Sequence, residues 1–258
     1  MIDIHSHIIP GLDDGSDNME DSLEMIRIAQ SSGTLAMVAT PHCNIEGHIE
    51  EYSLNMLMDG LDKLNKRIAE AGYQIEVLPG MEIYASEDIA EKIVEGRLIS
   101  LNSSRYFLVE FPFDTSTGWV DYILDRMQEV KGVVPVIAHP ERYFCVQLHP
   151  EVTYNWIRRG CLTQVNKASL AGKFGQLAFQ ACMDMAEHNL ITCVGSDAHT
   201  PYSRTPHMRE AWEFIKQEYS SAYAQLILVN NPQKIVRNIR IEMRGTAREI
   251  GKKHFWRD

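Results

Sequence analysis

The sequence predicts an α/β protein in which parallel strands close into a single barrel. Short apolar runs alternate with longer amphipathic stretches along most of the 258 residues. Such alternation is typical of parallel strands covered by helices, because strands that are buried on both faces are continuously apolar. The chain contains about seven strand–helix units, and that number in a chain of this length favours an irregular barrel over an open sheet.

The expected strands are short runs of mostly apolar residues, several of them β-branched, as suits a buried sheet. No linker rich in Pro, Gly or Ser and no change of composition separates these runs, so we expect one domain over residues 1–258. In chain order the strands are residues 1–4 (MIDI), 35–39 (LAMVA), 75–78 (IEVL), 106–110 (YFLVE), 133–138 (VVPVIA), 161–165 (CLTQV) and 190–194 (LITCV).

The expected helices are the amphipathic stretches between and after those strands. The first two end directly before Gly33 and Gly72, and glycine is favoured just past a helix C-terminus. Residues 244–258 form a basic tail, which we expect to be a solvated end. The helices are residues 19–32, 53–71, 87–95, 119–130, 152–159, 175–188, 206–218, 223–229 and 232–243.

The composition excludes several classes of function. With 25 basic and 35 acidic residues the net charge is -10, so general affinity for nucleic acid or anionic membranes is not expected. The five cysteines are odd in number and lack CxxC spacing, which indicates reduced thiols of a cytoplasmic protein. There is no export leader and no apolar run of about 18 residues, so we expect neither secretion nor a membrane-spanning segment.

Polar side chains capable of binding metal follow almost every expected strand. His5 and His7 come after the first strand and are spaced i, i+2, so they point to the same face. Asp197 and His199 repeat this spacing after the last strand. Because the carboxyl ends of barrel strands meet at one face, all these side chains are expected to converge there. The strands between contribute His42, Glu82, Glu110 and His139, and Asp14 follows the first histidine pair.

A multinuclear metal site explains this pattern better than a set of hydrogen-bonded core residues, because burying several carboxylates without cations is costly. Nine candidate ligands are too many for one ion and would serve two or three. Nitrogen and oxygen donors suit Mn²⁺, Fe²⁺ or Zn²⁺. The reaction expected at such a site is hydrolysis of a phosphoester, with hydrolysis of an amide as the second choice. Arg142 and Arg204, each close in sequence to a candidate ligand, favour the phosphoester because guanidinium groups bind phosphate oxygens.

These motifs together resemble a known family. The stretches HSH, TPH, GMEIY, LVEFP, AHPERY, TQVN, SDAH and RTPHM are similar to those of the polymerase-and-histidinol-phosphatase (PHP) superfamily. Within it, DIHSHIIPGLDDG with AHPERY and TQVN resembles the manganese-dependent protein-tyrosine phosphatases of Gram-positive capsule and exopolysaccharide loci. The resemblance extends from Met1 to about Arg240 and leaves the tail unmatched.

The resemblance implies a distorted (β/α)7 TIM-like barrel that holds three metal ions, with Mn²⁺ as the expected metal. Arg142 would be the catalytic, phosphate-binding arginine, and Arg204 resembles a second one. No ligand position is missing, although the adjacent Asp13 and Asp14 leave one assignment open. The implied ligand sets are His5, His7, Glu82 and Asp197 for the first ion, Glu82, Glu110 and His139 for the second, and Asp14, His42 and His199 for the third.

The substrate implied by the resemblance is the phosphotyrosine tail of a bacterial tyrosine kinase that controls polysaccharide synthesis, hydrolysed without a phosphoenzyme intermediate. None of the five cysteines is followed six positions later by the arginine that thiol-dependent tyrosine phosphatases need. Two alternatives stay open: a PHP small-molecule phosphatase, such as one for histidinol phosphate, and a metal-stabilised binding module without activity. The sequence does not determine the oligomeric state or the kinase.

Overall fold

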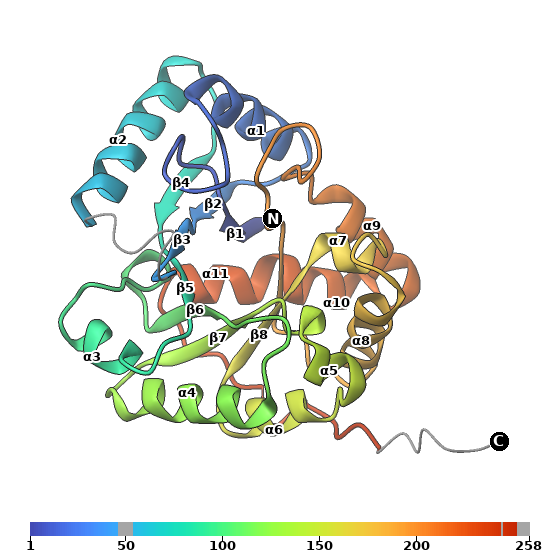
Figure 1. Cartoon of the computed structure of the whole chain (residues 1–258). Helices are drawn as coiled ribbons and strands as arrows, with labels where there is room; N and C mark the ends of the chain where they lie inside the picture. The colour runs from blue at the N-terminus through green and yellow to red at the C-terminus, as the bar shows by residue number, and fades with distance from the viewer. Residues whose placement is uncertain (46–53, 244, 252–258) are drawn as a thin grey trace.

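Parallel strands form the centre of the molecule and helices surround them (Figure 1). The computed structural model describes residues 1–45, 54–243 and 245–251. One sheet has the order β1-β2-β4 and the other β3-β5-β6-β7-β8-β9, and every ladder in both is parallel. The expected α/β class with parallel strands is thus confirmed. The strands are β1 Ile2–Ser6, β2 Ala36–Ala39, β3 His42–Cys43, β4 Glu76–Pro79, β5 Glu82–Tyr84, β6 Tyr106–Glu110, β7 Val134–Ala138, β8 Leu162–Asn166 and β9 Cys193–Gly195.

Two of the expected strands continue, after a break, into a second short strand. Pro41 separates β2 from β3, and proline has no N–H to donate to a ladder. Gly80 separates β4 from β5, where a β-carbon would lie only 2.7 Å from Val38 Cγ1. After these breaks the chain pairs in the other sheet, with His42 opposite Glu82. The breaks therefore bring two candidate ligands side by side.

The first and last strands also meet. Ser6 of β1 forms a parallel bridge with Ala198, just after β9. The His7 N–H donates to Ala198 O at 2.8 Å, and the Asp197 N–H donates to His5 O at 2.9 Å. The two segments that carry the i, i+2 pairs are therefore held against each other by backbone hydrogen bonds.

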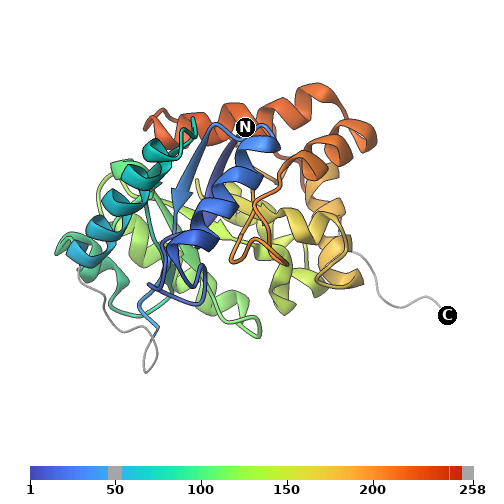
Figure 2. The same cartoon turned by 90° about the horizontal axis from the view of Figure 1, so that it is seen from above.

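The helices lie outside the strands, and the orange and red helices of the C-terminal part run together along one side (Figure 2). Asn18 caps α1 and Ser116 caps α4, each accepting a backbone N–H of the first turn. Helix bounds are α1 Met19–Ser31, α2 Leu54–Glu70, α3 Ile89–Val94, α4 Thr117–Glu129, α5 Phe144–Leu148, α6 Val152–Arg158, α7 Lys167–Leu170, α8 Gln176–Glu187, α9 Arg209–Glu218, α10 Ser221–Gln225 and α11 Asn231–Val236, with shorter helical turns at Leu101–Ser103, Pro140–Arg142 and Leu226–Asn230.

The expected helix over 232–243 is too long. Helix α11 ends at Val236, and Asn238 adopts a positive φ of 55°. The chain then runs past β6, where the Tyr106 hydroxyl donates to Ile239 O at 2.8 Å and accepts the Ile241 N–H at 3.0 Å. The helix expected from residue 206 begins at Arg209. The expected seventh strand begins at Cys193, and the first extends to Ser6.

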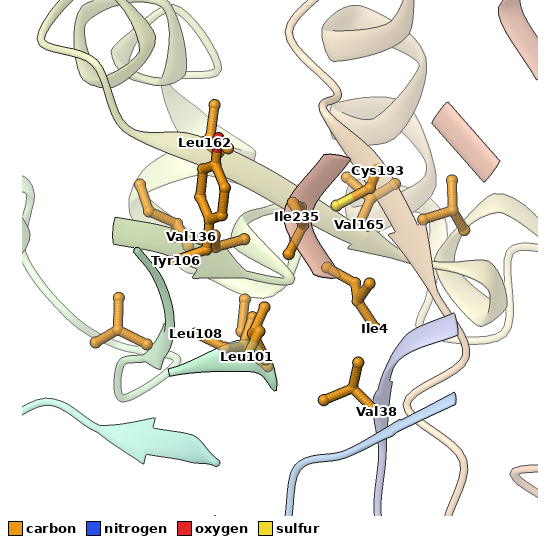
Figure 3. Packing of buried hydrophobic residues seen from close by; sticks show 14 of the residues in the cluster. Ile4, Val38, Leu101, Tyr106, Leu108, Val136, Leu162, Val165, Cys193 and Ile235 are labelled. Atoms are coloured by element: carbon orange, nitrogen blue, oxygen red, sulfur yellow. The ribbon is translucent and has the colours of Figure 1, made fainter. Parts of the chain in front are cut away.

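Apolar side chains from the strands fill the interior around α11 (Figure 3). Ile235 of α11 is fully buried and lies among Ile4, Val165 and Cys193 in that view. Two hydrogen bonds fix α11 where the strands begin, from the Asn231 side chain to Thr192 O at 2.8 Å and from the Asn102 side chain to Val236 O at 2.9 Å. The opposite, carboxyl ends of the strands are thus left for polar side chains.

Most of the described tail residues, 245–251, are exposed. Ile250 nevertheless packs against the rest of the molecule and is only 4% exposed, and the Arg248 N–H donates to His188 O just after α8 at 2.8 Å. Among the described residues no helix is long and apolar enough to cross a membrane. Several positions of interest lie outside the described residues, namely Ser53 at the start of an expected helix and Arg244, Lys252, Lys253, Phe255, Trp256 and Arg257 of the tail.

Candidate metal centre

All nine candidate ligands come together at the carboxyl ends of the strands. Glu82 lies at the centre of this cluster, because its two carboxylate oxygens contact four histidines from three different segments of the chain. His5 belongs to β1 itself, and His42 belongs to β3, where the sequence placed each of them after a strand. The other ligands begin, end or closely follow their strands, as expected.

The first group consists of His5, His7, Glu82 and Asp197, all of them buried. Glu82 Oε2 lies 3.1 Å from His5 Nε2 and 3.2 Å from His7 Nε2. Asp197 Oδ1 lies 3.6 Å and 3.4 Å from the same two nitrogens. Two imidazole nitrogens and two carboxylate oxygens can therefore surround one ion.

The second group joins Glu82 to Glu110. His42 Nδ1 lies 2.8 Å from Glu110 Oε1 and 3.2 Å from Glu82 Oε2, so His42 belongs here as well as with Asp14. His139 Nε2 approaches the same two acids, at 2.9 Å from Glu82 Oε1 and 3.9 Å from Glu110 Oε2. Glu82 is thus shared by two groups.

The third group contains His7, Asp14, His42 and His199. Asp14 Oδ1 lies 3.6 Å from His42 Nε2 and 3.5 Å from His199 Nε2. Burial and the neighbouring His7 lower the pKa of His199 to about 2, so its imidazole is neutral and can donate an electron pair. Asp14 is 65% exposed, which makes this the most open part of the site.

The hydrogen bonds of His5 and His7 show that the residues fit a cation. His5 Nδ1 donates to Gln164 Oε1 and His7 Nδ1 donates to Asp13 Oδ2, each at 2.7 Å. In their neutral forms, with Nδ1 protonated, both Nε2 atoms carry lone pairs and lie 3.2 Å apart. Despite burial, Glu82 and Asp197 raise the pKa of His5 and Asp13 raises that of His7, so these rings carry protons where a metal ion would otherwise bind. Glu82 Oε2, which faces both, is buried without a hydrogen-bond partner among the described residues. Electron pairs that converge in this way call for a positive ion between them.

The two adjacent aspartates have different roles. Besides holding His7, Asp13 accepts the backbone N–H of His42 at 2.9 Å and that of Gly15 at 3.0 Å. Burial opposes ionisation of Asp13, but His7 outweighs it and lowers the pKa of that carboxyl to about 2. Asp13 therefore orients a ligand, while Asp14 lies within ligand distance of the third group.

Burial disfavours charge on the central acids, and their neighbours reverse this effect. His5, His139 and His42 hold the pKa of Glu82 well below its usual range despite burial. For Asp197, also opposed by burial, His5, His7 and Arg204 likewise lower the pKa strongly. Both carboxylates are thus ionised at neutral pH and available to a metal.

Arg142 and Arg204 both face Asp197. Arg204 Nη2 lies 2.5 Å from Asp197 Oδ2 and Arg142 Nη1 lies 3.7 Å from the same oxygen. The Arg142 guanidinium also contacts two phenyl rings, with its central carbon 4.3 Å from the Phe113 centroid and 4.2 Å from that of Phe174. These two cation–π contacts restrict the side chain and leave N–H groups for an anion.

Several supporting residues escaped the sequence analysis. Gln164, in the middle of β8, holds His5, and Asn166 donates to Asp197 Oδ2 at 2.6 Å. Polar residues at i and i+2 within a buried strand were the available signal. Glu141, although adjacent to His139 in its motif, turns away and accepts the Asn166 N–H and the Ser169 hydroxyl. His139 and Asp197 both have positive φ, 32° and 51°, a strain that concentrates at functional sites.

Comparisons with known proteins agree with this geometry. Tyrosine-protein phosphatase YwqE of Bacillus subtilis (strain 168) is 36% identical over 238 residues, covering 92% of each chain. The structure described as YwqE from Bacillus subtilis and CpsB from Streptococcus pneumoniae, unique metal-dependent tyrosine phosphatases, matches with a TM-score of 0.89 and 35% identity, covering 98% of this chain and 100% of that one. A histidinol phosphate phosphatase from Lactococcus lactis, complexed with zinc, histidinol and phosphate, shares only the fold, with a TM-score of 0.57 and 13% identity over 84% of this chain and 93% of that one.

The family of the chain follows from a further match, which confirms the resemblance read from the motifs. The model for capsular polysaccharide synthesis proteins of the CpsB/CapC type matches residues 1–237, nearly all of the 258. The chain belongs to the CpsB/CapC family.

Proposed function

We propose that this protein is a metal-dependent protein-tyrosine phosphatase of capsule or exopolysaccharide synthesis. The observation that carries the proposal is the convergence of the His5 and His7 lone pairs on the unpartnered Glu82 oxygen. That arrangement fits a metal centre, and the family and its named relatives support phosphotyrosine as the group hydrolysed.

The site would hold two or three divalent ions, with Mn²⁺ preferred and Fe²⁺ or Zn²⁺ as alternatives, because imidazole and carboxylate donors suit all three. When bound, such ions polarise phosphoryl oxygens and lower the pKa of water. We assign as ligands His5, His7, Asp14, His42, Glu82, Glu110, His139, Asp197 and His199, since their donor atoms meet in the three groups described above.

The two arginines would bind the phosphoryl group. Arg142 contacts Phe113 and Phe174 and presents N–H groups beside Asp197. Arg204 approaches the same carboxylate from the loop after His199. Charge-assisted, forked hydrogen bonds from both would orient the phosphate and stabilise the charge that develops on it.

The substrate we propose is the phosphotyrosine tail of a bacterial tyrosine kinase in the cytoplasm. A disordered phosphopeptide can reach a site at the open end of the strands. The five cysteines form no disulfide, and none has an arginine at the required spacing, which favours a reducing compartment and a mechanism without a thiol nucleophile. We also infer that the two sheets form one distorted (β/α)7 barrel, counting β2 with β3 and β4 with β5 as bent single strands and closing at the Ser6–Ala198 bridge.

A direct test compares two substrates. Metal-stripped protein is assayed without metal and with Mn²⁺, Fe²⁺ or Zn²⁺ for phosphate release from a phosphotyrosine peptide and from histidinol phosphate. The Arg142→Ala variant tests the phosphate-binding role. Arg126→Ala is the matched control, because its side chain is 25% exposed, close to the 20% of Arg142, and pairs with Glu91 and Glu129.

We expect Mn²⁺-dependent hydrolysis of the peptide that Arg142→Ala abolishes and Arg126→Ala preserves. Hydrolysis of histidinol phosphate alone would leave the metal chemistry in place and overturn the proposed substrate. No hydrolysis of either substrate with any of the three metals would overturn the proposed enzyme and revive the inactive binding module.

A further inference from the structure

A pocket of about 370 Å³ is lined by Arg142 but not by Asp197. Its volume is within the range of small-molecule sites, about 300–1,000 Å³. Helices α5 and α8, which lie side by side at this edge of the molecule, supply two of its walls (Figure 1). The principal lining residues are Phe113, Arg142, Phe144, Gln147, Phe174 and Leu177.

The pocket is apolar and aromatic although it is open to solvent. The residue exposures of Phe113, Phe144 and Leu177 are 43%, 55% and 60%. Of the described residues that line it, Arg142 is the only charged one. Exposed apolar side chains gathered at one place mark a binding surface more often than chance, because leaving them in water brings no gain in stability.

The pocket is continuous with the metal centre. The Phe113 ring centroid lies 6.2 Å from that of His139, a candidate ligand, and the same ring contacts the Arg142 guanidinium. Arg142 therefore belongs both to the phosphate site and to the pocket wall. A phosphate ester held by the N–H edge of Arg142 would place its organic group at the entrance of the pocket.

We propose that this pocket is an aryl-binding subsite that receives the tyrosine ring of the substrate and so favours aryl over alkyl phosphate esters. The inference rests on the proposed function and adds the feature that selects the substrate. An aromatic ring gains free energy from offset or edge-to-face contacts with Phe113 and Phe144. Gln147 Nε2 donates to Glu141 O at 3.0 Å, which leaves the amide oxygen of this lining residue to accept a peptide N–H next to that ring.

Two variants test the pocket without disturbing Arg142. Phe144→Ala and Leu177→Ala remove apolar walls of the pocket and keep Phe113 and Phe174, the two rings that contact the guanidinium. Leu148→Ala is the matched control, because Leu148 lies on the same helix as Phe144, is 54% exposed and does not line the pocket. Calorimetry on Mn²⁺-loaded protein measures the Kd of benzylphosphonate, which carries a ring, and of methylphosphonate, which does not.

We expect the parent protein to bind benzylphosphonate more tightly than methylphosphonate. Phe144→Ala and Leu177→Ala should each raise the Kd of benzylphosphonate roughly threefold to tenfold and leave the Kd of methylphosphonate unchanged. Leu148→Ala should match the parent for both. Phe174→Ala should raise the Kd of both phosphonates, because it removes one of the two rings that contact Arg142.

The aryl subsite would be overturned if Phe144→Ala weakened the binding of both phosphonates equally. It would also be overturned if the parent protein bound benzylphosphonate no more tightly than methylphosphonate. The same selective loss in Leu148→Ala would overturn it too, because the effect would then not come from the pocket. If the two variants weakened the binding of a phosphotyrosine peptide but not of benzylphosphonate, the pocket would hold a neighbouring residue of the peptide rather than the tyrosine ring, and the proposal would be wrong. A parent that binds both phosphonates yet hydrolyses no phosphotyrosine peptide would refute the proposed function instead.

Discussion

Asp13 should control metal affinity although it is not placed as a ligand. Its carboxylate accepts three hydrogen bonds, from His7 Nδ1 at 2.7 Å, from the His42 N–H at 2.9 Å and from the Gly15 N–H at 3.0 Å. The substitution Asp13→Asn keeps the shape but removes the charge and one acceptor oxygen. Whichever way the amide turns, its NH₂ group replaces one acceptor oxygen, and the bond to His7 loses its charge, so His7 would be oriented less firmly.

The size of the effect follows from those contacts. A hydrogen bond to a charged group contributes about 1.5–3 kcal/mol, and the bond to His7 is the one that acts on a ligand. Because about 1.4 kcal/mol corresponds to a tenfold change in an equilibrium constant, Mn²⁺ affinity should fall about 10- to 100-fold. Asp14→Asn should behave differently. Asp14 is 65% exposed, so its loss should reduce the number of bound ions while stability changes by less than about 0.5 kcal/mol.

Isothermal calorimetry with Mn²⁺ on metal-stripped protein separates the two variants, because it reports affinity and stoichiometry at once. We expect Asp13→Asn to weaken the tightest binding and Asp14→Asn to lower the number of ions bound. Circular dichroism checks that both variants remain folded. Parent-like affinity in Asp13→Asn, together with weakened tight binding in Asp14→Asn, would show that the two roles are assigned the wrong way round.

Three further outcomes are expected. Arg142→Lys should lower kcat/KM for a phosphotyrosine peptide about 100-fold in steady-state assays, because lysine has neither the fork nor the flat guanidinium that contacts Phe113 and Phe174; a loss below threefold would contradict this. Free Mn²⁺ at about 1,000 times its Kd should raise the Tm of metal-stripped protein by about 10 °C in scanning fluorimetry, and an unchanged Tm would argue against a structural link between metal and fold. Maleimide followed by peptide mass spectrometry should modify the half-buried Cys145 before Cys193, since full burial raises the pKa of the Cys193 thiol more strongly; the reverse order would refute that reasoning.

The fold was predictable where burial alone decides the pattern. A strand such as β7 (VPVIA) is apolar along its whole length because it is buried, and that signal needs no knowledge of neighbours. The break between β4 and β5 depends instead on how closely Gly80 approaches Val38, a contact between distant segments. The end of α11 did leave a trace in the sequence. Ile239, Ile241 and Met243 alternate with polar residues, which indicates an extended chain rather than a helix.

The site was predictable because carboxyl ends of parallel strands meet, whatever the details of packing. The sharing of ligands was not. His42 contacts Glu110 as well as Asp14 only because β3 pairs with β5 after the break. The choice between Asp13 and Asp14 likewise depended on side-chain direction. The two are neighbours in the chain, yet one is buried against His7 and the other faces solvent.

The charges of the site explain how an acidic protein can attract a phosphate. The chain has a net charge of -10, and the four candidate carboxylate ligands, Asp14, Glu82, Glu110 and Asp197, would repel an anion if they stood alone. Two divalent ions would balance those four charges, and a third would add an excess of positive charge. Arg142 and Arg204 then remain for a phosphoryl dianion. Attraction would thus be confined to the loaded site while the rest of the surface repels polyanions, which favours a substrate that offers one isolated phosphate over nucleic acid.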